Sequence, residues 1–293
     1  MARSRITDAQ LLAHVNKLGD EHPPIRLDSV DYTVNNPDVL RTRFAGVLDY
    51  LARVELEVER NVLELLTIMP NPSEADRVFY SDVWYDQEIA HGQILDELKR
   101  RIDLPEAEPQ LAVGFAVQAL GALARFEPIQ DVARTIYYFT GASTERQAVL
   151  AYNALSTQLD ELGEKAVRET IINQIKRQEP GHFAFYRMSA EKIMTDGTLR
   201  PWQVFLARLL RERSYELVGT HNDPVHQATM GEVIDVLGFD GQLEAFAKEI
   251  GRLEAKLLWA NKQGMEFPPY VLRALRESVE LYREQGSFAA RLS

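Results

Sequence analysis

The chain has 293 residues, of which 45% are hydrophobic, so it can bury one substantial core. Its 44 acidic and 33 basic residues give a net charge of −11, which argues against nucleic acid as a general partner. It contains no cysteine, which excludes disulfides, iron–sulfur clusters and thiol catalysis, so electrons for redox chemistry must come from a separate carrier.

No Pro-, Gly- or Ser-rich linker divides the chain, and we expect a single domain over residues 1–293. No signal-peptide core and no run of about eighteen apolar residues occur, so we expect a soluble cytoplasmic protein without a membrane span. Residues 1–36 combine a short helical pattern with a break at Pro23-Pro24, and we expect an N-terminal arm there.

The first long helix is predicted from Pro37 to Met69, with its end at Pro70-Asn71-Pro72. Residues at helical spacing form an apolar stripe that one acid, Glu55, interrupts. The stripe consists of Phe44, Leu48, Leu51, Glu55, Val58, Val62, Leu65 and Met69.

Three acids, Glu55, Glu57 and Glu59, cluster on this helix, and periodicity separates them. Glu57 shares its face with Arg53 and Arg60, and we expect that face to contact solvent. Glu59 lies one turn from Glu55 on the same flank. Glu55 is therefore the predicted inward-facing acid and Glu59 the second candidate.

The second helix is predicted to begin after Ser73, which has Asp76 three residues on as its capping partner, and to end near Leu104-Pro105. It carries Glu88 and His91, three residues apart inside an apolar pattern. Side chains at i and i+3 lie on one helix face, so both can reach one metal ion.

The apolar segment from Pro109 to about Phe126 is predicted to be a buried crossover helix or a dimer-face helix. A third helix follows, with a break at Glu161-Leu162-Gly163, and Glu145 is the charged residue on its apolar stripe. The fourth helix carries a second pair, Glu179-Pro180-Gly181-His182. Because a proline removes a helical hydrogen bond, we expect a kink or π-bulge at this pair.

The two halves of this pattern match in length, since Glu55 precedes Glu88 by 33 residues and Glu145 precedes Glu179 by 34. Two Glu-x-x-His pairs and one further Glu from each remaining helix are the ligand set of a dinuclear metal site in a four-helix bundle. Two divalent cations would neutralise the four buried carboxylates. The predicted ligands are Glu55, Glu88, His91, Glu145, Glu179 and His182.

The predicted metal-binding bundle occupies residues 37–195, and residues 196–293 are predicted to add packing helices. These are expected at Pro201–Val218, Ala228–Leu237, Gln242–Lys262 and Pro268–Glu284. His221 and His226 flank a turn at Asp223-Pro224, and we interpret them as ordinary loop histidines rather than a second metal site.

From residue 44 to about 195 the chain resembles the ferritin-like di-iron carboxylate proteins, and most closely the soluble acyl-acyl-carrier-protein desaturases (fatty acid desaturase type 2). The resemblance rests on Trp84, Glu88, His91, Gly92 and Leu95; on Glu145-Arg146 preceded by Tyr138-Phe139-Thr140; and on Glu179, His182 and Tyr186. The chain departs from the family at Ala148, where a threonine is common, and matches it only loosely around Glu55.

The resemblance implies an all-α protein with a ferritin-like four-helix bundle and a dinuclear iron site, with Mn/Fe as an alternative metal content. It implies an O₂-dependent oxidase of an unactivated C–H bond, most simply an acyl-chain desaturase or hydroxylase. It also implies an electron donor such as ferredoxin, an acyl carrier protein as partner, and a homodimer.

Other readings stay open at this point. They are a di-iron oxygenase of a small amine or other natural-product intermediate, a non-catalytic iron-oxidising or ligand-binding protein, and a ribonucleotide reductase small subunit with Tyr186 in place of its radical tyrosine. The acidic chain needs a local basic patch to dock an acidic carrier protein. The basic clusters Lys99-Arg100-Arg101, Lys176-Arg177 and Arg208-Arg211-Arg213 are candidates, or are solvated helix ends.

Overall fold

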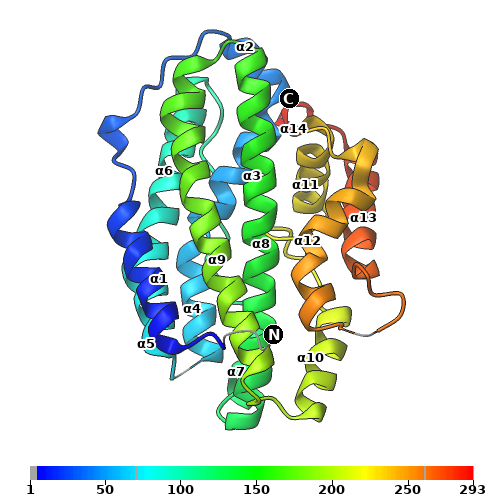
Figure 1. The fold of residues 1–293 in the computed structure, drawn as a ribbon. Helices are drawn as coiled ribbons and strands as arrows, with labels where there is room; N and C mark the ends of the chain where they lie inside the picture. Colours follow the sequence, from blue (N-terminus) through cyan, green and yellow to red (C-terminus); the bar gives the residue numbers. More distant parts are fainter. Residues whose placement is uncertain (1–4, 70, 261, 293) are drawn as a thin grey trace.

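The computed structural model describes residues 5–69, 71–260 and 262–292, and these form helices and loops without any β-strand (Figure 1). The predicted helix end at Pro70 and residues 1–4 of the predicted arm lie outside the described residues, as do the side chains of Phe115 and Leu120. The helices before the long α8 are α1 (Asp8–Glu21), α2 (Pro37–Arg43), α3 (Ala45–Leu56), α4 (Val58–Ile68), α5 (Glu74–Val78), α6 (Tyr85–Arg101) and α7 (Phe115–Leu123). The others are α8 (Glu127–Glu161), α9 (Asn173–Thr195), α10 (Pro201–Arg213), α11 (Pro224–Val236), α12 (Leu243–Leu257), α13 (Pro269–Gln285) and α14 (Phe288–Leu292).

Helices α8 and α9 run side by side along the length of the molecule, with α3, α4 and α6 behind them (Figure 1). Helix α3 packs on α6, and α4 contacts both α6 and α8. Helix α1 covers α5 and α9 on one edge, while α10 and α12 pack on the other side of α8. The buried apolar residues form one continuous core, and the helical content of the described residues agrees with the all-α prediction.

The predicted first helix is three helices, because the chain departs from α-helical geometry at Phe44 and at Glu57. At Glu57 the backbone N–H is shared between the carbonyl oxygens of Arg53 (3.1 Å) and Val54 (3.2 Å), which tightens the turn. The side chains of α4 therefore do not continue the helical faces of α3 in simple register. Helical periodicity alone could not locate this break.

The second helix begins as predicted, because Ser73 and Asp76 form a reciprocal capping box at the start of α5. A π-helical segment, Phe79–Trp84, then joins α5 to α6 directly before the first Glu-x-x-His pair, and the sequence did not predict it. A second π-helical segment, Val167–Ile172, precedes α9. Helix α9 is continuous through Pro180, so the prediction of a distortion at the second pair is wrong. The π-helical turn lies before α9 instead.

Helix α8 ends at Glu161, as the sequence predicted. The apolar segment before it is shorter than expected: only Phe115–Leu123 is helical, and Leu111, Leu123 (57% exposed) and Phe126 (67% exposed) contact solvent. The prediction of a buried crossover is therefore wrong for these three side chains, and a dimer-face role stays a prediction. No helix among the described residues has the length and apolarity that a membrane crossing requires.

Four C-terminal helices form where they were predicted, but α10 ends at Arg213, not at Val218, and α12 ends at Leu257, not at Lys262. Helix α11 begins at Pro224, four residues before the predicted Ala228. The loop 214–223 after α10 lies against α3, where the Tyr50 hydroxyl donates to the Val218 carbonyl oxygen at 2.8 Å. Helix α11 covers a neighbouring part of α3. The C-terminal third therefore buries a face of α3 that the sequence predicted to be solvated.

Candidate metal centre

Four helices bring the six predicted ligands together at the centre of the molecule. Helix α3 supplies Glu55, α6 supplies Glu88 and His91, α8 supplies Glu145, and α9 supplies Glu179 and His182; all six side chains are buried. Their ligand atoms form two overlapping groups, and within each group all of these atoms lie within 4.8 Å of one another. The first group is Glu55, Glu88, His91 and Glu179, and the second is Glu88, Glu145, Glu179 and His182.

Glu88 and Glu179 belong to both groups, whereas Glu55 and His91 belong to the first group alone and Glu145 and His182 to the second alone. The close approach of α3 and α6 that this requires depends on Gly92, since a Cβ there would overlap Leu56. Glycine beside His91 therefore serves helix packing next to the cluster.

The donor set fits two divalent cations, as its unpartnered atoms show. Glu88 Oε1, Glu179 Oε1, His91 Nδ1 and His182 Nδ1 are buried and have no hydrogen-bond partner. His182 Nδ1 lies 2.9 Å from Glu88 Oε1, and His91 Nδ1 lies 3.4 Å from Glu179 Oε1. Leaving such a buried polar atom unpaired costs about 1–3 kcal/mol, and bound cations would satisfy all of them.

The cluster shifts the pKa values of its members in opposite directions. Burial and the Glu55 charge raise the pKa of Glu88 well above its usual value. Burial would raise the pKa of Glu55 too, but its interactions with the Glu88 carboxyl, the His91 imidazole and the Tyr152 hydroxyl hold it at about 2. Burial raises the pKa of Glu145 to about 7, against the opposing effect of His182. Without cations, the carboxylates therefore cannot all be ionised together.

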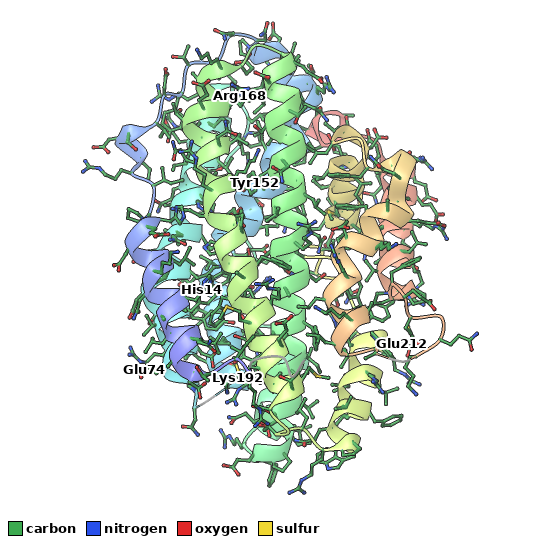
Figure 2. All side chains as sticks on the ribbon, in the orientation of Figure 1. His14, Glu74, Tyr152, Arg168, Lys192 and Glu212 are labelled. Atoms are coloured by element: carbon green, nitrogen blue, oxygen red, sulfur yellow. The ribbon has the colours of Figure 1, made fainter. Side chains whose placement is uncertain are left out.

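The two end carboxylates each accept a hydrogen bond from an aromatic side chain. Tyr152, labelled on α8 in Figure 2, donates its hydroxyl to Glu55 Oε1 at 2.5 Å, and Trp84 Nε1 donates to Glu145 Oε1 at 3.2 Å. These donors leave the second oxygen of each carboxylate free to face the cluster. The sequence assigned neither aromatic residue this role, although Trp84 belongs to the motif that carries the family resemblance.

The structure also separates Glu55, Glu57 and Glu59, the three acids of the predicted first helix. Glu55 is in the cluster and Glu59 is exposed, so Glu59 is not a ligand candidate. The expectation that Glu57 contacts solvent is wrong: Glu57 is 1% exposed. Its carboxylate accepts from Arg53 Nη1 at 2.9 Å and from Arg60 Nη2 at 3.2 Å, and lies 2.8 Å from His221 Nε2, because loop 214–223 covers this face.

His221 is thus a partner of a buried acid, while no metal-ligand group among the described residues includes His221 or His226. His226 lies in the first turn of α11, so the interpretation of both residues as loop histidines is wrong for His226.

A cavity of about 490 Å³ adjoins the Glu145 end of the cluster. Trp84, Glu145 and Tyr186 form its inner wall, and Arg60, Glu64 and His221 are among its polar lining residues. Helices α4, α8 and α10 and the loop 214–223 supply further lining residues, which include Ile68, Ile136, Tyr137, Thr140, Thr144, Gln147, Leu210, Arg211, Glu216 and Leu217. The cavity therefore combines an apolar and aromatic part with charged and hydroxyl-bearing side chains.

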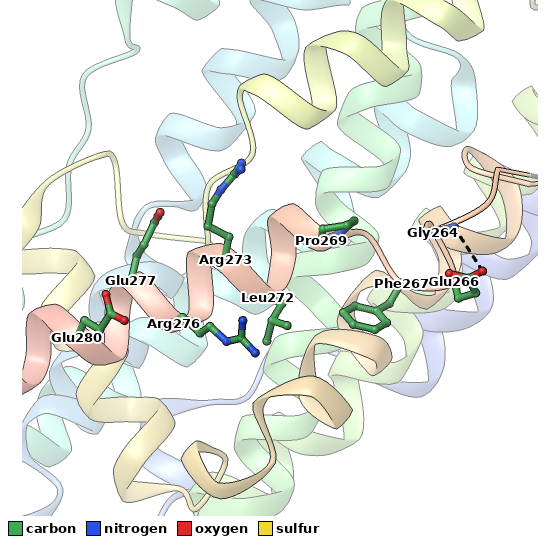
Figure 3. Close-up of a pocket in the computed structure, with 9 residues that line it drawn as sticks. All are labelled: Gly264, Glu266, Phe267, Pro269, Leu272, Arg273, Arg276, Glu277 and Glu280. Atoms are coloured by element: carbon green, nitrogen blue, oxygen red, sulfur yellow. Dashed lines mark hydrogen bonds between the residues drawn. The ribbon is translucent and has the colours of Figure 1, made fainter.

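A second hollow of about 430 Å³ lies along α13 and the loop before it (Figure 3). Its lining includes Leu272, Arg273, Arg276 and Glu280 but none of the six cluster residues. We therefore assign it no part in the metal centre.

The predicted basic docking patches are partly internal. Lys99 is fully buried, with Nζ 2.7 Å from Asp49 Oδ1, and Arg211 is buried against Glu254. Arg100 and Arg101 both pair with Glu97. The prediction of a free basic cluster is therefore wrong for Lys99 and Arg211, which are buried and paired with acids, whereas Arg100 and Arg101 are exposed at the end of α6.

Two glutamines complete the surroundings of the cluster, and the sequence analysis missed both. Gln87 Oε1 lies 2.6 Å from His182 Nε2, and Gln178 Oε1 lies 2.6 Å from His91 Nε2. A signal was present, because a glutamine directly precedes the glutamate in each Glu-x-x-His pair.

Comparisons of the chain with models of protein families, with curated proteins and with solved structures give no significant match.

Proposed function

We propose that the cluster is a dinuclear metal centre in a ferritin-like bundle formed by α3/α4, α6, α8 and α9, and that the protein is an O₂-dependent di-iron oxidase of a C–H bond. The observation that carries the proposal is the pair of overlapping ligand groups with Glu88 and Glu179 in common. That arrangement of four carboxylates and two histidines is the ligand set of the di-iron and di-manganese carboxylate proteins. The resemblance of residues 44–195 to the acyl-carrier-protein desaturases supports the same proposal.

The bound iron ions would supply the O₂-activating redox chemistry. The six buried side chains would hold the ions, and Tyr152 and Trp84 fix the orientation of the outer carboxylates. Since the chain has no cysteine, two electrons would come from a carrier such as a ferredoxin. In a desaturation, one O₂, two electrons, two protons and the two hydrogen atoms removed from the substrate would together give two water molecules.

The cavity beside Glu145 distinguishes two substrate classes. A long acyl chain is best held by a continuous apolar tunnel, whereas this cavity carries Arg60, Glu64 and His221 as well as apolar side chains. Arg60 is already paired with Glu57, and burial raises the pKa of Glu64. These polar side chains make a small polar molecule, such as an amine, a second candidate substrate beside the acyl chain that the sequence resemblance implies.

Metal analysis and oxygen uptake test the proposal together. Metal-free protein is loaded with Fe(II) without oxygen, and we expect roughly two ions per chain. Oxygen consumption is then measured with a chemical reductant and ferredoxin against acyl carriers, free fatty acids and small amines. Glu55→Ala should lose one ion and the uptake, while Glu59→Ala, on an exposed position at the start of α4, should keep both.

Folded wild-type protein that retains no iron, or one ion per chain, would refute the dinuclear centre. Two ions without uptake on any substrate would instead favour a non-catalytic iron protein. Oxygen uptake with acyl carriers but with no amine would favour the desaturase function over the oxygenation of a small molecule.

A further inference from the structure

Each histidine of the cluster contacts the glutamine that directly precedes the other Glu-x-x-His pair. Gln178, next to Glu179, contacts His91, and Gln87, next to Glu88, contacts His182, both at 2.6 Å. All four side chains are buried. The contacts therefore run across the interface between α6 and α9 rather than within either helix, although the residues concerned belong to the two repeated sequence motifs.

The orientation of both amides is set from the N-terminal arm. Gln178 Nε2 donates to the carbonyl oxygens of Pro23 (2.9 Å) and His22 (3.3 Å), and Gln87 Nε2 donates to the same His22 carbonyl. A carbonyl oxygen can only accept, so each amide must turn its nitrogen toward the arm and its oxygen toward the histidine.

This orientation decides which ring nitrogen faces the cluster. An amide oxygen accepts, so Nε2 of His91 and of His182 must carry the hydrogen. The other ring nitrogen, Nδ1, then points at the carboxylates, where it has no hydrogen-bond partner. Because the glutamines are neutral, they orient the rings without adding charge to a cluster that already holds four carboxylates.

The arm is itself fixed to the helix that carries the second pair. His14 Nε2 of α1 lies 3.0 Å from the Gly181 carbonyl oxygen, and the buried Leu18 packs where a Cβ on Gly181 would stand. Figure 2 shows His14 on α1, beside α9. The segment His22–Pro23 leads directly out of this anchored helix.

We propose that Gln87 and Gln178 are positioning residues that each orient the histidine of the opposite Glu-x-x-His pair, and that the carbonyl groups of His22 and Pro23 lock both. The proposal rests on the proposed metal centre, since orientation of Nδ1 matters for a metal ligand. It makes the N-terminal arm part of the site and not merely a covering of the bundle.

Crossed variants in single-site backgrounds test the proposal. In Glu55→Ala protein only the group of Glu88, Glu145, Glu179 and His182 is complete, and in Glu145→Ala protein only the group of His91 is complete. Methionine has nearly the length of glutamine but no amide. We expect Gln87→Met to weaken cobalt(II) binding about 10–100-fold in the Glu55→Ala background, and Gln178→Met to do so in the Glu145→Ala background. The opposite combinations should change affinity by less than about threefold.

The metal-free protein gives an independent readout of ring orientation. We expect histidine NMR spectra of the wild type to show exchange-protected Nε2–H protons for His91 and His182. Gln87→Met should remove the protection at His182 alone, and Gln178→Met at His91 alone. If the wild type binds no cobalt(II) but shows this pattern, the metal centre fails while the positioning stands.

The role of the arm is tested at Leu18. Leu18→Ala loosens the contact with Gly181, and we expect it to weaken both cobalt(II) sites together, since the His22 carbonyl serves both amides. Leu275→Ala in α13 is the matched buried-leucine control and should leave both sites unchanged. The proposal would be overturned if Gln87→Met acted on His91 or Gln178→Met on His182. It would also be overturned if one glutamine change weakened cobalt(II) binding at both sites equally, or if no variant changed it.

Discussion

Glu57→Ala should destabilise the protein strongly and leave its metal content unchanged. The side chain is 1% exposed and is shared by two guanidinium groups, those of Arg53 and Arg60, which are themselves buried. Its Oε1 also accepts the backbone N–H of Gln110 at 3.2 Å. Alanine would leave two buried cations with Glu64, 3.5 Å from Arg60 Nε, as the remaining acid of this group.

Removal of one partner from a buried ion pair costs about 3–5 kcal/mol, because the remaining charge stays desolvated. For a chain of this length the entropy of unfolding is about 0.6 kcal/mol/K, from roughly 2.1 cal/mol/K per residue. The melting temperature of Glu57→Ala should therefore fall by about 5–8 °C. Helical periodicity alone, which put Glu57 in solvent, would predict a change of no more than about half a kcal/mol.

Circular dichroism melting of metal-free protein and metal analysis after reconstitution measure the two effects separately. Glu55→Ala in α3 and Glu59→Ala in α4 complete the comparison. The first should lose an ion, and the second, on an exposed position, should change neither quantity. The reasoning is refuted if Glu57→Ala melts within about 1 °C of the wild type, or if it loses metal while Glu55→Ala keeps it.

Metal at about 100 times its dissociation constant should stabilise the fold by about 2.7 kcal/mol per site, and equal melting of chelated and loaded protein would contradict this. Burial raises the pKa of Glu145 to about 7, and the facing carboxylates raise the pKa of His182 although burial alone would lower it. The folded state then holds these protons more tightly than the unfolded state, so metal-free stability should fall as pH rises from about 4.5 to above 7. Melting curves should accordingly show the gap between loaded and metal-free protein widening over this range, and a constant gap would argue against it. Gly141→Ala would push its Cβ into the Tyr186 ring, with an expected loss of about 1–3 kcal/mol in chemical unfolding, whereas Gly114→Ala, with no atom within 4 Å of a Cβ, is the control and should lose much less.

The sequence by itself predicted the six residues that the structure brings together. This was possible because the i, i+3 spacing of each Glu-x-x-His pair depends only on local helix geometry. The same reasoning located the end of α8 and the Ser73–Asp76 cap, which are also local features. The choice of Glu55 over Glu59 succeeded because the apolar stripe of α3 faces the core.

Tertiary structure alone decided what covers the other faces. Glu57 is buried because loop 214–223, far away in the sequence, lies on α3, and periodicity carries no information about such a distant segment. The contacts from Gln87 to His182 and from Gln178 to His91 likewise need α6, α9 and the arm to meet. Local spacing thus determines which side chains share a helix face. Burial, hydrogen-bond partners and the shape of a cavity depend instead on contacts between distant segments, and no short sequence pattern reveals those contacts.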